Sequence, residues 1–272
     1  MSKKSTTLFD IPLYNGKYSD FITKIQNPEK KTLVFTPNPE IFVRASRDSE
    51  FMDILGQATY NVPDANGLYV GYMMWEGKSF FTSALRTFFC KKFIRDNYGE
   101  LIKWSDLTRD VLEWWKNTPK KILVIDRKNT VPKNELERRK AEVQKNLKHI
   151  LEEKYPGITV FVVFDGEVSP EDMAQMIQKE GIDFVFSCIG MKNQEKRLIE
   201  VFSYLKENQK VVWLWVGASI DFLLGLQKRA PKIFQKLGLE WLYRLITQPR
   251  IRARRIWDAV YHFQKLIKNT SN

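Results

Sequence analysis

The sequence predicts an α/β protein in which helices flank a parallel, doubly wound sheet, with a basic, amphipathic helical appendage at the C-terminus. Short apolar runs alternate along most of the chain with longer stretches of helical spacing, and this alternation is typical of parallel sheets. The charge is uneven, because residues 228–272 contain 11 Lys or Arg and two acids, which is +9 of the net +12. The change near Lys228 predicts a boundary between residues 1–227 and residues 228–272.

The apolar runs predict six strands, at residues 32–36, 59–62, 121–125, 158–164, 183–189 and 211–216. Helices are predicted at residues 107–116, 132–154, 170–180 and 193–206, and a further helix is expected to start after Asp64. Parallel sheets bind ligands beyond the carboxyl ends of their strands. We therefore expect the site on one rim formed by the loops TPNPE (36–40), PDANG (63–67), IGMKNQEK (189–196) and VGASID (216–221).

Composition excludes several classes of protein. Cys90 and Cys188 lie far apart and in no CxxC or Cys/His pattern, which argues against a disulfide framework or a zinc site and favours a reducing cytoplasm. The N-terminus has no apolar core of a secretory signal, and the longest apolar run, residues 211–220, is too short to span a membrane. Any membrane contact is therefore expected to be peripheral.

The tail, residues 228–272, interleaves aromatic and cationic side chains. Ile256, Val260, Phe263 and Ile267 predict one apolar stripe of an amphipathic helix whose first turns are rich in arginine. Two interpretations are about equally favoured: the stripe packs on the protein's own core, or the segment binds an anionic surface that has apolar depth. A bilayer with acidic lipids fits the second better than a nucleic acid does.

Few residues of the strand-end loops are suited to chemistry. His149 and His262 fall in predicted helices, and the chain has no P-loop, GxGxxG or Asp-x-Asp motif. This argues against histidine catalysis, an ATPase, a dinucleotide enzyme and a metal-bridged sugar nucleotide, so no cofactor or metal is expected. Asp64 can act as a general base if it is partly buried, or it can cap the following helix.

Polar residues in the other loops are candidate ligands. Thr36 and Asn38, in a loop stiffened by two prolines, can hydrogen-bond a sugar or a phosphate, or cap the next helix. Gln194 lies in the third loop, and Asp221 follows the last strand, where its carboxylate can accept hydrogen bonds from ribose hydroxyls or a base.

Four segments together resemble a known family. TPNPEIFVRA, VPDANG, IGMKNQEKRLI and above all VGASIDFLLGLQKRAPKIFQKLGLEWLYRLITQPRI are similar to the WecG/TagA/CpsF glycosyltransferases, which move N-acetylmannosamine-type sugars from UDP donors to undecaprenyl-diphosphate-linked sugars. The likeness is strong over residues 183–255 and 32–67, and weak over residues 72–101 and 127–172. The resemblance implies a metal-independent, inverting transferase whose catalytic part is a Rossmann-like domain, residues 1–227. It also implies that the protein is cytoplasmic and that its tail associates with the inner face of the membrane.

The resemblance also implies roles for the candidate residues: a catalytic base, Asp64; a polar pocket for the sugars, Thr36 and Asn38; a sugar-binding glutamine, Gln194; and a contact at the nucleoside end, Asp221. Arg244, Arg250 and Arg254 are the expected diphosphate ligands, because a guanidinium pairs bidentately with phosphate oxygens. The implied partners are a UDP-sugar, a lipid-diphosphate-linked acceptor and an anionic membrane surface. An oligomer is compatible with the sequence.

Departures from the family pattern qualify these roles. The chain has Pro63-Asp64-Ala65 where PDG is usual, and residues 125–129 replace a Gly-rich loop. An expected pocket arginine is absent, and Lys103 or a basic residue of the insertion at 76–103 could replace it. The Phe- and Lys-rich insertion predicts either a second membrane contact or a lid over the site. The alternatives to transfer are an inactive, membrane-bound binding protein and a nucleic-acid-binding protein.

Overall fold

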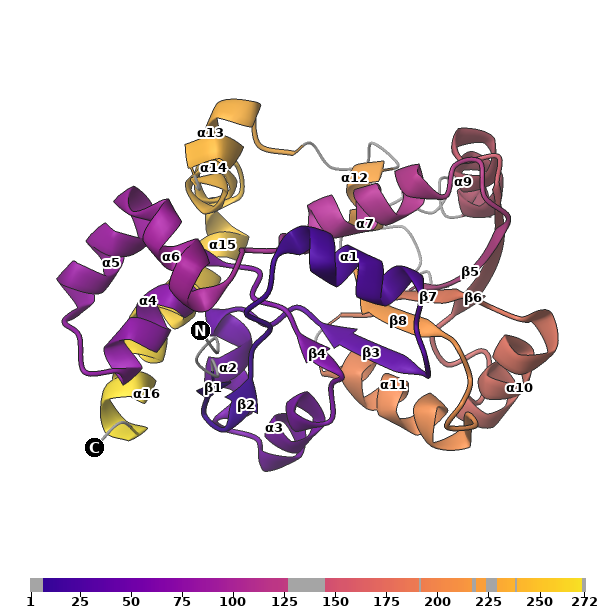
Figure 1. Ribbon diagram of the computed structural model, residues 1–272, viewed down its shortest axis with the longest axis horizontal. Helices are drawn as coiled ribbons and strands as arrows, with labels where there is room; N and C mark the ends of the chain where they lie inside the picture. The colour runs from indigo at the N-terminus through magenta and orange to yellow at the C-terminus, as the bar shows by residue number, and fades with distance from the viewer. Residues whose placement is uncertain are drawn as a thin grey trace. The chain divides into compact units, whose positions relative to one another are not determined.

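The structure, a computed structural model, describes residues 7–126, 145–190, 192–216, 219–223, 229–237 and 239–270. It confirms the predicted α/β class: the main sheet has the strand order β4-β3-β8-β7-β5-β6 (Figure 1). Its strands are β3 (Thr32–Phe35), β4 (Tyr60–Asn61), β5 (Lys120–Asp126), β6 (Ile158–Phe164), β7 (Phe184–Ser187) and β8 (Val212–Trp215). Each predicted strand is present, with ends within two residues of those expected.

The chain divides into two compact units. Unit 1 comprises residues 1–21, 35–103 and 229–272, and unit 2 comprises residues 22–34 and 104–228. The tail therefore belongs to the same unit as the TPNPE and PDANG loops. The IGMKNQEK and VGASID loops belong to unit 2.

In unit 2, parallel pairing aligns the ends of neighbouring strands. Val212 lies level with Thr32 on one side and with Phe184 on the other, and β5 pairs in parallel with both β6 and β7. Every residue of β3 and β7 is buried, as expected for strands covered on both faces. The carboxyl ends of these strands consequently fall at one edge of the sheet.

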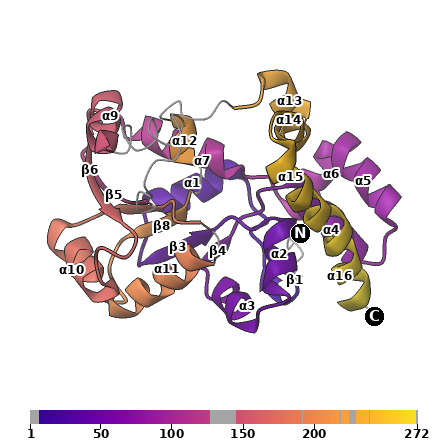
Figure 2. The ribbon, with the colours of Figure 1, turned by 180° about the vertical axis from the view of Figure 1, so that it is seen from behind.

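Helices cover both faces of the unit 2 strands. They are α7 (Trp104–Trp114), α9 (Leu147–Lys154), α10 (Pro170–Glu180), α11 (Asn193–Tyr204) and α12 (Ser219–Leu223). In both views α10 and α11 lie on one face, with α7 and α12 on the other (Figures 1 and 2). The prediction for 170–180 is confirmed: Ser169 caps α10, Pro170 begins it and Gly181 ends it at φ +64°. Of the helix predicted at 132–154, residues 132–144 lie outside the described chain.

Unit 1 is mainly helical. Besides a short antiparallel pair, β1 (Thr7–Leu8) and β2 (Ile11–Pro12), it contains α2 (Pro39–Ala45), α3 (Ser49–Gly56), α4 (Asn66–Trp75), α5 (Phe80–Phe89) and α6 (Lys91–Tyr98). The tail adds α13 (Lys232–Leu237), α14 (Glu240–Thr247), α15 (Pro249–Trp257), the π-helix η1 (Asp258–His262) and α16 (Phe263–Thr270). Helix α1 (Tyr18–Gln26) begins in unit 1 and continues into unit 2.

The last helix of the tail packs on α4, within unit 1. Phe263 and Ile267 are 2% and 0% exposed, and a Cβ added at Gly71 of α4 would lie 2.3 Å from Cε1 of Phe263. Glycine at this position therefore allows α16 to approach α4 closely.

The predicted apolar stripe is interrupted. Val260 is 48% exposed, as is Tyr261, whereas the same stripe is buried at Phe263 and Ile267. The reason is η1, since i→i+5 bonding adds a residue to the turn and rotates the face that follows. Packing on the core thus holds for Phe263 and Ile267, whereas Val260 of the predicted stripe is half exposed.

The described residues contain no helix with both the length and the apolarity needed to cross a bilayer.

Candidate functional site

Two of the predicted loops lie against each other in unit 1. The amide of Val62 donates to the carbonyl of Phe35 (2.8 Å), and the amide of Asp64 donates to the carbonyl of Pro37 (3.3 Å). A Cβ at Gly67 would lie 2.8 Å from Cγ of Pro39, so a glycine here permits the contact. Asp64 is thereby brought beside the loop that carries Thr36 and Asn38.

Asp64 is not the cap of the helix that follows it. The N-cap of α4 is Ala65, whose side chain makes no capping hydrogen bond. Asp64 is partly buried, a condition under which a carboxylate can serve as a base while still reaching a ligand. The capping interpretation is therefore wrong for this residue.

Asn38, in contrast, does cap a helix. Its Oδ1 accepts a hydrogen bond from the amide of Ile41 (3.2 Å) at the start of α2, and Pro39 occupies the first turn. The side-chain amide nitrogen of Asn38 takes no part in that bond. Thr36 is 5% exposed, so the protein covers almost all of its side chain.

A buried carboxylate follows this loop and holds the tail. Glu40, 4% exposed in the first turn of α2, accepts hydrogen bonds through Oε1 from Nη2 of Arg44 and through Oε2 from Nε of Arg255, both at 2.7 Å. Buried charges require such partners. This role of Glu40 was not predicted from the sequence, because the tertiary structure brings the distant Arg255 to it.

A second carboxylate holds two further cations. Glu240, in the first turn of α14, lies 2.9 Å from Nη2 of Arg244 and 3.7 Å from Nζ of Lys103. Lys103 also donates to the carbonyl of Gln235 (3.2 Å). The lysine suggested as a replacement for the missing pocket arginine thus contacts the tail.

Arg252 lies among the other arginines without a carboxylate partner in the part of the chain that the structure describes. Its Nε faces the neutral Oε1 of Gln248 at 3.4 Å. Burial, together with the positive charges of Arg255 and Arg244, lowers the pKa of Arg252 to about 10, and Glu40 offsets part of this effect. A cation crowded by like charges favours an incoming anion, and this residue too was missed.

Arg250 and Arg254, two of the predicted ligands, are exposed. Their i, i+4 spacing places them on one face of α15, roughly opposite Arg252 and Arg255. Arg244 is the predicted ligand that lies in the partly buried group.

The remaining predicted residues belong to unit 2. Gln194 lies in the first turn of α11 and Asp221 within α12, following β7 and β8; their side chains lie outside the described chain. The backbone before α11 is unusual, because Gly190 has φ +107° and Lys192 has φ +69°. Non-glycine residues with a positive φ, such as Lys192, are often found in functional loops. Of the altered segment 125–129, residues 127–129 are also outside the described chain.

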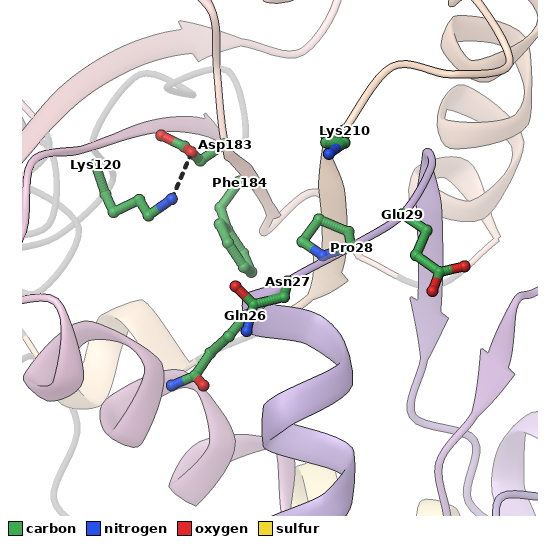
Figure 3. Close-up of a pocket in the computed structure, with 8 residues that line it drawn as sticks. All are labelled: Gln26, Asn27, Pro28, Glu29, Lys120, Asp183, Phe184 and Lys210. Carbon is green, nitrogen blue, oxygen red and sulfur yellow. Dashed lines mark hydrogen bonds and ion pairs between the residues drawn. The ribbon is translucent and has the colours of Figure 1, made fainter.

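A pocket of about 290 Å³ lies elsewhere in unit 2 (Figure 3). It is lined by Gln26, Asn27, Pro28, Glu29, Lys120, Asp183, Phe184 and Lys210. Lys120 begins β5 and Phe184 begins β7, so the pocket lies at the amino ends of strands. Nζ of Lys120 is 2.8 Å from Oδ1 of Asp183, and the lining includes none of the predicted site residues. We interpret this ion pair as bracing β5 against β7.

Over the described ranges, no three His, Cys, Asp or Glu side chains form a group able to hold a metal ion.

The model of the Glycosyl transferase WecG/TagA/CpsF family matches residues 6–82 and 91–271. This chain belongs to that family. The WecG/TagA/CpsF match thus covers both units and the tail, and the enzyme class is glycosyltransferase. It omits residues 83–90, a shorter stretch than the expected insertion at 76–103.

Three similar proteins carry the same name, N-acetylglucosaminyldiphosphoundecaprenol N-acetyl-beta-D-mannosaminyltransferase. The protein of Bacillus subtilis (strain 168) is 25% identical over 251 residues, which is 90% of this chain and 85% of the relative. That of Bacillus spizizenii is 25% identical over 260 residues, 94% and 88% of the two chains. That of Staphylococcus aureus (strain NCTC 8325 / PS 47) is 25% identical over 236 residues, 85% and 79%.

Proposed function

We propose that this protein transfers an N-acetylmannosamine-type sugar from a UDP donor to an undecaprenyl-diphosphate-linked N-acetylglucosamine, by a metal-independent, inverting reaction in cell-surface polysaccharide synthesis. Family membership and the names of the relatives support the reaction class. The observation that carries the proposal is the bond between Glu40 and Arg255. It ties the cationic tail to the helix that begins directly after the Thr36–Asn38 loop, against which the Asp64 loop packs.

In the proposed reaction, the carboxylate of Asp64 accepts the proton of the acceptor hydroxyl as that oxygen attacks the anomeric carbon. The bond from this carbon to the diphosphate oxygen breaks, and UDP leaves with the electron pair. A single displacement on an α-linked donor inverts the anomeric centre and gives a β-linked product, in agreement with the relatives' names. General-base catalysis contributes about 10²–10⁴ in rate.

Arginines are proposed to stabilise the charge that develops on the leaving diphosphate. We assign this to Arg244 and Arg252, since both are partly buried beside other cations and preorganised cations need no rearrangement in the transition state. We assign Arg250 and Arg254, on the exposed face of α15, to the diphosphate of the lipid-linked acceptor and to anionic head groups. Arg255 positions the tail through Glu40.

The other predicted contacts remain proposals. Thr36 and Asn38 are assigned to the sugars, with the side-chain nitrogen of Asn38 as a donor beyond its capping oxygen. Gln194 is assigned to the donor sugar and Asp221 to the nucleoside. Each supplies hydrogen-bonding groups of the kind that a sugar nucleotide requires.

We further propose that residues 228–272 associate peripherally with the cytoplasmic face of the membrane and that residues 1–227 form the catalytic part. Trp241, Trp257 and Tyr261 are 45%, 58% and 48% exposed, and the rings of Trp257 and Tyr261 stack at 4.8 Å. Amphipathic aromatic rings next to cations are suited to the head-group region of an anionic bilayer.

In the decisive experiment, the purified protein is incubated with UDP-N-acetylmannosamine and a short-chain N-acetylglucosamine diphospholipid. The product is detected by mass spectrometry. We expect transfer in the presence of a chelator, and a loss of about 100-fold or more for Asp64→Asn. Asp53→Asn, the same change on the exposed surface of α3, is the matched control and should retain full activity. Equal activity of the two variants, with equal melting temperatures, would remove Asp64 as the base.

A further inference from the structure

Helix α5 presents its apolar side to solvent and its small polar side to the protein. Phe81, Leu85 and Phe89 follow at i, i+4 and i+8 on one face and are 71%, 43% and 80% exposed. Ser83 and Thr87 are 0% and 4% exposed. This is the reverse of the pattern expected for a surface helix of a globular protein.

The buried polar side of α5 is satisfied within the helix. The hydroxyl of Ser83 donates to the carbonyl of Ser79 (2.8 Å), and that of Thr87 donates to the carbonyl of Ser83 (2.8 Å). Small side chains let α5 lie close to α4, with which it packs. The orientation of the helix is therefore fixed by contacts on its inner side and leaves the apolar side outward.

Cations lie around the apolar face. Lys91 and Lys92 are exposed at the start of α6, directly after Phe89 and Cys90. Arg86 lies with its guanidinium 5.3 Å from the ring centre of Phe93. An apolar stripe bordered by positive charge matches a bilayer with anionic head groups. A second copy of the chain is a poorer match, because two such faces would bring their lysines together.

The family match also leaves out most of this helix, since it stops at residue 82 and resumes at 91. Helix α5 packs on α4, the helix that also receives α16 of the tail.

We infer that α5 is a second membrane-docking element, which inserts Phe81, Leu85 and Phe89 into the head-group region of an anionic bilayer while Lys91 and Lys92 pair with lipid phosphates. The inference rests on the proposed function for the bilayer as partner. Its role is to hold unit 1 at the surface where a lipid-linked acceptor is found.

The test is co-sedimentation of the full chain with vesicles of phosphatidylglycerol and phosphatidylcholine, and with vesicles of phosphatidylcholine alone. The triple variant Phe81→Gln, Leu85→Gln and Phe89→Gln changes only exposed side chains and keeps good helix formers. We expect at least about a tenfold fall in partition onto anionic vesicles. Trp114→Gln with Tyr204→Gln, which removes two exposed aromatics of unit 2, should bind as the parent does.

A second variant, Lys91→Glu with Lys92→Glu, should bind anionic vesicles more weakly and with a shallower salt dependence than the parent, with little change on phosphatidylcholine alone. Unchanged vesicle binding of the triple variant would overturn the inference. So would an altered oligomeric state in light scattering with unchanged vesicle binding, since α5 would then be a self-association face.

Transfer to a water-soluble acceptor separates this inference from the proposed function. We expect the triple variant to keep parental activity in that assay, whereas a lid over the site would lose it, and such a loss would overturn membrane docking as the role of α5. If the parent protein transfers no sugar but the vesicle results are as expected, the proposed function fails and the docking surface stands.

Discussion

The Nε atom of Arg255 lies 2.7 Å from Oε2 of Glu40, across 215 residues of chain. The side chain of Glu40 is 5% exposed and that of Arg255 is 38% exposed, so the acid is desolvated and depends on its cations. This bond joins the tail to the turn that begins α2. The position of the other tail arginines relative to Thr36, Asn38 and Asp64 depends on it.

Replacing this carboxylate should loosen the tail. For Glu40→Gln we expect a loss of about 2 kcal/mol in unfolding free energy, because two arginines lose a buried partner. We also expect faster proteolysis within residues 229–270, measured by limited digestion. Arg44→Gln is the control: Arg44 is 52% exposed, and its loss should cost under about 1 kcal/mol. Equal effects of the two variants would show that the bond to Arg255 contributes nothing.

Arg252 should lower the stability of the protein without ligand and raise its affinity for UDP. Its pKa is lowered by burial and by Arg255 and Arg244, so Arg252→Gln should leave the melting temperature without ligand unchanged or raised. The same variant should bind UDP about tenfold or more weakly by calorimetry, because a charge-assisted hydrogen bond is lost. Arg109→Gln, on α7 of unit 2, should change neither quantity. A variant that melts lower and binds UDP normally would refute this assignment.

The lowered pKa of Arg252 predicts that stability and UDP affinity both depend on pH. Burial and neighbouring cations lower the pKa of folded Arg252 to about 10, below the ordinary value of an arginine, so the unfolded chain binds more protons between these two values. The contribution of Arg252 to stability therefore rises with pH across that window. Its charge, and the anion affinity that depends on it, should fall as pH rises through about 10. UDP affinity measured from neutral to alkaline pH should fall more steeply for the parent than for Arg252→Gln, and parallel curves would contradict this.

Gly71 tests the packing of the tail on α4. A Cβ here would lie 2.3 Å and 2.7 Å from two ring atoms of Phe263, so Gly71→Ala should cost about 1–3 kcal/mol despite the better helix propensity of alanine. Gly56→Ala is the matched control, because its Cβ would meet only Cδ1 of Ile11 at 3.7 Å. Adding Phe263→Leu to Gly71→Ala should restore part of the loss in a urea titration. If stability is not restored, the loss caused by Gly71→Ala does not come from the contact with Phe263.

The two exposed arginines of α15 should act at the membrane rather than on UDP. For Arg250→Gln with Arg254→Gln we expect about a tenfold or greater loss of binding to anionic vesicles, at about 1 kcal/mol for each charge. Binding of UDP should stay within about twofold of the parent. If the double variant lost as much UDP affinity as Arg252→Gln, these two arginines would instead be ligands of the donor's diphosphate.

The sequence by itself determined the class of fold, because short apolar runs and stretches of helical spacing are local signals. The strands at Thr32–Phe35 and Ile158–Phe164 and the helix Pro170–Glu180 follow from such signals. It also determined the family, since the motifs around Asp64 and along the tail are contiguous in the chain. The +9 charge of residues 228–272 is likewise a property of composition.

Only the tertiary structure decided which of these residues meet. The pairing of Glu40 with Arg255, the crowding of Arg252 and the burial of Phe263 on Gly71 depend on segments far apart in the chain, and no local pattern specifies them. The exposure of Phe81 and Phe89 was decided in the same way: the periodicity of α5 marks an apolar face, but whether that face is covered depends on what the rest of the chain packs against it.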